Sequence, residues 1–118
     1  MAENKLVEMS FEFAKIIVDI VDNAKRPNSF YMYNQLARSG TSVGANIYEA
    51  QYAHSKADFV AKLEIALKEA NETSYWLKLL FETGRLSQDE FTSTDRLCGN
   101  IRRLLIASCN TAKKDDVD

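Results

Sequence analysis

Proline, glycine and histidine are scarce in this sequence of 118 residues, which has one proline, four glycines and one histidine. Turns draw heavily on glycine and proline, so this scarcity argues against a many-stranded β fold. No run approaches the roughly 18 apolar residues of a membrane span, and the polar start lacks the pattern of a signal peptide. We therefore expect a single all-α domain, located in the cytoplasm and without a membrane segment.

Two cysteines and a small net charge set further limits. Cys98 and Cys109 are eleven residues apart, which separates them by about 16 Å along a helix and prevents a disulfide between them. The net charge of −2 argues against a generic, strongly basic nucleic-acid binder. Local basic patches are still compatible with this charge.

Apolar residues recur every three or four positions in four stretches, which predicts four helices. Short connections make neighbouring helices antiparallel, so the expected fold is an antiparallel up-and-down four-helix bundle. The apolar stripes are wider than one core requires, which favours a homo-oligomer. The expected helices cover residues 4–25, 29–53, 55–83 and 87–112, followed by a frayed tail at 113–118.

The helix boundaries carry local signals. Pro27 ends the first stretch, Ser55 is a candidate N-cap of the third, and Gly84 is a candidate C-terminal cap. Ser87 and Glu90 have the spacing of a capping box at the start of the fourth. These signals support the division into four helices.

Two glycines, Gly40 and Gly44, fall inside the second expected helix, where each costs about 1 kcal/mol relative to alanine. We expect them to let a neighbouring helix approach closely, in a packing seam that also includes Ser42. A ligand or partner groove is the alternative. Arg38 and Glu49 share a face of this helix, and with Glu72 of the third helix they are expected to form an ionic network that fixes register rather than performs catalysis.

Basic residues on the fourth helix form a candidate nucleic-acid surface, because they could neutralise phosphates. The alternative is a solvated face, since acids at the start and bases at the end of a helix suit its dipole. No aromatic residue is interleaved with these cations along the helix, which disfavours single-stranded binding. The residues are Arg96, Arg102, Arg103, Lys113 and Lys114.

Residue patterns of a catalytic or cofactor site are weak. His54 lies in the expected turn between the second and third helices. The Glu-x-x-His pairs of di-iron bundles are absent, and Ser42 or Cys98 would lack a neighbouring base as a nucleophile. We expect no catalytic residue, no metal and no cofactor. An enzyme would need His54 to meet a carboxylate from another helix.

The continuous block from Gln35 to Leu80 closely resembles a bacterial family of four-helix bundle proteins. These proteins were first noticed as reading frames inside intervening sequences of large-subunit ribosomal RNA genes. The resemblance implies an up-and-down bundle that assembles into a ring-like homopentamer, and implies no known reaction. A related branch contains the accessory variability proteins of diversity-generating retroelements, which bind nucleic acid. The matching residues are Arg38, Ser39, Gly40, Ser42, Asn46, Ile47, Glu49, Ala50, Phe59, Leu63, Ala66, Glu72 and Leu77.

Together these patterns predict a non-enzymatic, self-assembling bundle that acts as a binding or scaffold module. The candidate partners are structured RNA and an RNA-handling protein. The alternative is a protein–protein interaction or structural module with no role in nucleic-acid binding. Arginines paired with acids of the same subunit would favour that alternative.

Overall fold

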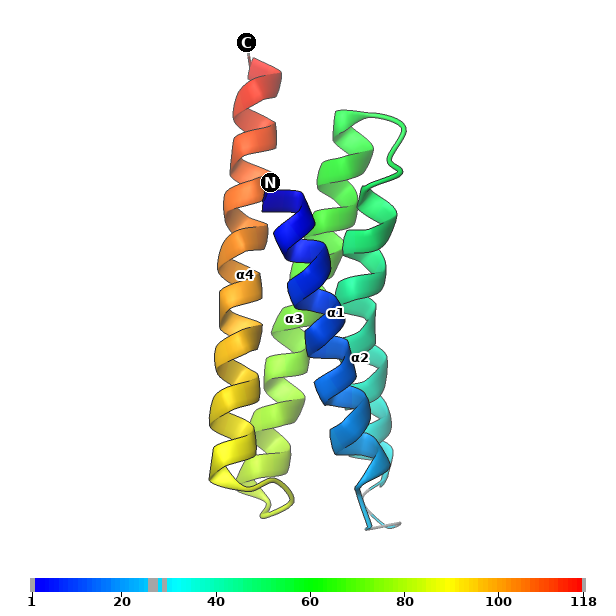
Figure 1. Ribbon diagram of the computed structural model, residues 1–118, viewed down its shortest axis with the longest axis vertical. Coiled ribbons are helices and arrows are strands. Elements are labelled where there is room, and N and C mark those ends of the chain that lie inside the picture. The colour runs from blue at the N-terminus through cyan, green and yellow to red at the C-terminus, as the bar shows by residue number, and fades with distance from the viewer. Residues whose placement is uncertain (1, 26–27, 29, 118) are drawn as a thin grey trace.

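The fold is a bundle of four helices. The computed structural model describes residues 2–25, 28 and 30–117. Within these residues there is no strand, and the helices run from Ala2–Asp22 (α1), Phe30–Ala50 (α2), Lys56–Glu82 (α3) and Gln88–Val117 (α4). Successive helices point in opposite directions (Figure 1), and α1 and α3 each contact both α2 and α4. The expected antiparallel four-helix architecture is confirmed.

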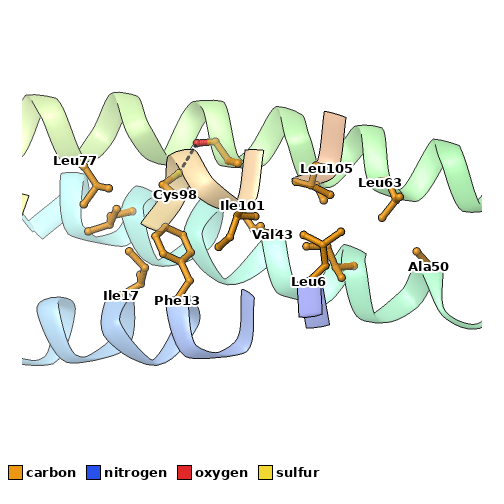
Figure 2. Packing of buried hydrophobic residues seen from close by; sticks show 14 of the residues in the cluster. Leu6, Phe13, Ile17, Val43, Ala50, Leu63, Leu77, Cys98, Ile101 and Leu105 are labelled. Carbon is orange, nitrogen blue, oxygen red and sulfur yellow. Dashed lines mark hydrogen bonds between the residues drawn. The ribbon is translucent and has the colours of Figure 1, made fainter. Parts of the chain in front are cut away.

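Side chains from all four helices meet in one continuous core. The bundle is 52 Å long and about 22 by 19 Å across, so the core is a narrow column along its axis. Figure 2 shows this column from the side, with Phe13 and Ile17 of α1 facing Ile101 and Cys98 of α4. Fully buried members on every helix follow the three-four spacing that an amphipathic helix requires.

Capping bonds explain where α3 and α4 begin. The hydroxyl oxygen of Ser55 accepts a hydrogen bond from the Asp58 amide at 3.1 Å. At the start of α4, Ser87 Oγ accepts from the Glu90 amide at 3.1 Å, while Glu90 Oε1 accepts from the Ser87 amide at 3.3 Å. These reciprocal bonds satisfy amide groups that the helix itself leaves unpaired.

Between α3 and α4, Gly84 has a φ of +78°, the left-handed conformation that glycine adopts without strain. The following Arg85 amide donates to the Leu80 carbonyl at 2.8 Å and the Gly84 amide to the Phe81 carbonyl at 3.0 Å. This pair of bonds closes the C-terminal end of α3. The chain can therefore reverse direction within five residues before α4 starts.

Two helices end three residues before their expected limits, because tight turns replace their last turns. α1 ends at Asp22 rather than at residue 25, where the Ala24 amide bonds the Val21 carbonyl at 3.1 Å. α2 ends at Ala50 rather than at residue 53, and the next three amides likewise bond carbonyls three residues back. The expected start of the second helix at residue 29 lies outside the described residues.

The expected frayed tail is wrong for residues 113–117, which continue α4 to Val117. Ala112 is buried in the core, and Lys113 Nζ forms an ion pair with Glu64 Oε2 of α3 at 2.8 Å. Cations also suit the negative end of the helix dipole. Residue 118 lies outside the described residues. Over the chain that the structure describes, no helix combines the length and apolar character needed to cross a membrane.

Candidate functional site

The glycines of α2 form its contact with α1. A Cβ atom built on Gly40 would lie 2.9 Å from Cγ1 and Cγ2 of Ile17, and one built on Gly44 would lie 3.3 Å from the Ser10 carbonyl oxygen. Both distances are shorter than an ordinary carbon contact. The glycines therefore let the backbone of α2 approach α1 closely.

Hydroxyl groups in the same stretch of α2 mostly bond to their own helix. Ser42 Oγ donates to the Arg38 carbonyl at 2.6 Å, and Thr41 Oγ1 donates to the Ala37 carbonyl at 2.7 Å. Ser39 Oγ donates to the Leu36 carbonyl at 3.4 Å, and it is also buried and accepts from Thr73 Oγ1 of α3 at 3.0 Å. Bonds of this kind satisfy hydroxyls without a ligand.

Arg38 links α2 to α3 at the bundle surface. Its Nη1 pairs with Glu69 Oε1 at 3.2 Å, and its Nη2 pairs with Glu72 Oε2. The indole N–H of Trp76 donates to the same Glu72 oxygen at 3.0 Å. The bond from Arg38, and secondly that from Trp76, holds the pKa of Glu72 below its ordinary value. This arrangement fixes two helices relative to each other.

Glu49 does not join this network, and its assignment to it is wrong. It lies eleven residues after Arg38, which is about 16 Å further along the helix axis, beyond the reach of that side chain. Sharing a helical face was therefore not sufficient for contact. Instead, exposed Glu49 borders a groove between α1 and α2.

This α1–α2 groove has a volume of about 590 Å³ and is mainly apolar. Phe11 of α1 and Tyr48 of α2 line it, with 64% and 57% of their surfaces exposed. Sequence analysis did not single out these two residues, because they lie off the buried stripes of their helices. The signal was the excess of apolar positions beyond the core.

Four of the five predicted cations on α4 are exposed, and Arg102 is half-buried. Arg102 Nη1 donates to Asn71 Oδ1 of α3 at 3.5 Å, and Arg103 Nη2 donates to Asn100 Oδ1. Among these five, only Lys113 pairs with an acid, Glu64, within the part of the chain that the structure describes. The remaining four side chains, Arg96, Arg102, Arg103 and Lys114, define the cationic face.

The neighbouring helix α3 carries an exposed aromatic side chain, Tyr75. Tyr75 of α3 is 59% exposed and lies one turn after Asn71, the residue that contacts Arg102. Its ring meets that of Trp76 edge to face, with centroids 5.0 Å apart. Spacing within α4 could not indicate Tyr75, because this residue belongs to α3.

The side chains considered for nucleophilic or acid–base chemistry lie in places that suit a structural role. Cys98 Sγ donates to the Ala70 carbonyl at 3.3 Å, and burial raises the pKa of its thiol to about 12. His54 is exposed in the α2–α3 connection, where its backbone amide donates to Asp58 Oδ2 at 3.3 Å. In the described ranges, no three histidine, cysteine or acidic side chains are grouped to hold a metal ion.

Fold and surface together define an antiparallel four-helix bundle with a cationic face. Residues 2–107 match the model of the 23S rRNA-intervening sequence protein family. The chain belongs to this family. It is also similar to the crystal structure of a protein of unknown function from the S23 ribosomal protein family of Bacteroides thetaiotaomicron, with a TM-score of 0.89 and 44% sequence identity. That similarity covers 93% of this chain and 99% of the other. A search of curated proteins finds no match.

Proposed function

We propose that this protein is a non-enzymatic, self-associating bundle of the cytoplasm that binds structured RNA through the cationic face of α4. The observation that carries this proposal is the partner of each central arginine. Arg102 and Arg103 are held by the amide oxygens of Asn71 and Asn100, which carry no formal charge. Their positive charges thus remain available to phosphates.

The family name, which refers to intervening sequences of 23S rRNA, is the reason for choosing an RNA as the candidate partner. The chain as a whole has a net charge of −2, so any RNA contact would be confined to one face. α1 adds to this asymmetry, because the exposed acids of its described side chains outnumber the exposed bases even though Lys15 pairs with Glu12. The acids are Glu8, Glu12, Asp19 and Asp22, and the bases are Lys5 and Lys15. An RNA would meet repulsion there and attraction at α4.

Self-association is proposed through the α1–α2 groove, with a second copy of the chain as its occupant. Phe11 and Tyr48 expose apolar surface to water in this groove. Contact with a second copy would bury that surface. The resemblance to the ribosomal RNA intervening-sequence proteins favours a ring-like homopentamer. A ring would also repeat the cationic face around a common axis, which multiplies weak phosphate contacts.

Fluorescence anisotropy with a labelled structured RNA, measured over a salt series, tests the RNA-binding role. The variant is the double charge reversal Arg102→Glu/Arg103→Glu. The matched control reverses Lys5 and Lys25, two exposed residues outside α4 and outside the lining of the α1–α2 groove, which changes the net charge equally. We expect affinity to fall steeply with salt, and binding to be lost in the α4 variant but retained in the control.

Equal losses in both variants would show only a response to net charge and would reject the α4 surface. No binding by the wild type at low salt would reject the RNA role. The apolar groove would then favour the rival function, a protein–protein interaction module without nucleic acid.

A further inference from the structure

Gly99 of α4 lies beneath two guanidinium groups. A Cβ atom built on Gly99 would be 3.8 Å from Nη2 of Arg102 and 3.8 Å from Nη1 of Arg103. The two nitrogens are therefore no more than twice this distance apart. Gly99 is buried even though its neighbours Arg96 and Arg103 are exposed. The two arginine side chains thus fold back over the glycine from adjacent positions of the helix.

Each guanidinium is held in place by a neutral oxygen. Asn71 Oδ1 of α3 accepts a hydrogen bond from Arg102 Nη1 at 3.5 Å, and Asn100 Oδ1 of α4 accepts one from Arg103 Nη2. The acidic residue that precedes Gly99 on α4, Asp95, accepts a hydrogen bond from Ser74 Oγ at 2.8 Å. Among the described residues neither guanidinium forms an ion pair, so two positive charges are positioned together without a carboxylate partner. Both charges would attract an anion that lies between them, and this attraction offsets their mutual repulsion.

We infer that Arg102, Arg103 and Gly99 form a clamp for a single phosphate group. One arginine already satisfies the two oxygens of a carboxylate, whereas a phosphate has enough oxygens to accept from two guanidinium groups. Because Gly99 has no side chain, nothing projects from its own position between the two guanidinium groups. This inference rests on the proposed function when the phosphate belongs to an RNA backbone, and stands alone when it is a free phosphate.

The RNA anisotropy assay tests the clamp with four variants. Gly99→Gln fills the space and Arg102→Lys keeps the charge but loses the planar fork, so each should lower affinity about tenfold or more. Gly99→Ala adds one carbon at an ordinary contact distance, and Arg96→Lys preserves a charge outside the clamp. Both variants keep every positive charge of the cationic face, so both should bind RNA within about threefold of the wild type.

Unchanged affinity in Gly99→Gln, or an equal loss in Arg96→Lys, would overturn the clamp. Circular dichroism and mass measurement establish that each variant is folded and assembled. Arg102→Lys decides the question if Gly99→Gln does not fold, because it leaves the backbone of α4 untouched.

Inorganic phosphate provides a readout that does not depend on RNA. The Nε–Hε NMR signals of Arg102 and Arg103 should shift saturably with phosphate and not with sodium chloride at equal ionic strength. The shift should disappear in Gly99→Gln. Such a shift without any RNA binding would retain the clamp and reject only the RNA role. If phosphate causes no shift of these signals, the clamp is overturned, even if RNA binds elsewhere on the cationic face.

Discussion

Gly40 of α2 and Ile17 of α1 are so close that no further atom fits between them. A Cβ on Gly40 would lie 2.9 Å from two side-chain carbons of Ile17. Ile17 is fully buried and β-branched, so its side chain has few alternative rotamers. The conformational cost of glycine inside α2 is offset by this close packing of two helices.

Replacing Gly40 by leucine should therefore destabilise the bundle by about 3 kcal/mol or more, since overpacking displaces both backbone and side chains. Thermal and urea unfolding measure the effect. Gly99→Ala is the matched control, because its Cβ would meet its nearest neighbours at an ordinary contact distance of 3.8 Å, and should stabilise by up to about 1 kcal/mol. If the Gly40→Leu protein melts at the same temperature as the wild type, then close packing of α1 on α2 at Gly40 is refuted.

Glu72 should make stability dependent on pH in the acid range. Its pKa in the folded state is lowered from the ordinary value of 4.5, chiefly by the hydrogen bond from Arg38. A lowered folded pKa means that the stabilisation is complete above the unfolded pKa and is lost as pH falls through the folded pKa. We expect this loss below about pH 4.5, where the unfolded side chain binds protons first.

The only tryptophan reports on this carboxylate directly, because Trp76 Nε1 donates to Glu72 Oε2. Its emission should titrate with a midpoint below 4.5 in the wild type. Glu72→Gln should remove that transition, while Asp58→Asn, a change elsewhere on α3, should leave it in place. If the transition in Trp76 emission survives in Glu72→Gln, then it arises from the titration of another group.

Cys98 should be inert toward thiol reagents in the folded protein. Burial raises the pKa of this thiol to about 12, so almost none of it is thiolate at pH 8. In a Cys109→Ala background, modification should be at least about a hundredfold slower than in urea, because only the thiolate reacts. Rapid native modification would contradict the burial of Cys98 in the core.

Local chemistry and helical periodicity were sufficient to predict the architecture. Ser55 and Ser87 cap through neighbours three residues away, so their bonds depend on spacing alone. Relations between helices were harder. The sequence predicted Arg38, Glu49 and Glu72 as one network, and the ion pair between Arg38 and Glu72 confirms that part. Only packing shows that Glu69 of α3, rather than Glu49 of α2, is the second acid that Arg38 contacts.

Gly99 shows a signal that was present in the sequence and not used. It is a helix-interior glycine outside the apolar stripe, followed three and four residues later by Arg102 and Arg103. That spacing allows both side chains to fold back over it. The hydrogen bond that holds Arg102 could not be predicted from this spacing, because its acceptor, Asn71, lies on a different helix.

Ala45→Arg tests the assembly proposed through the α1–α2 groove. Ala45 is exposed and lines the groove near Tyr48, so a long charged side chain would fill the space that a second copy is proposed to occupy. Light scattering after size exclusion should show a multimer for the wild type and a mass near 13.4 kDa for the variant. Helix content should not change, because the substituted position faces outward.

Ala61→Arg is the control for this experiment, since Ala61 is also exposed but lies on α3, away from the groove. It should keep the wild-type mass. Ala45→Arg with an unchanged multimer would place the interface elsewhere, and a monomeric wild type would reject self-association. A monomeric Ala45→Arg that binds RNA more weakly, with Arg102 and Arg103 intact, would show that affinity depends on repetition of the cationic face.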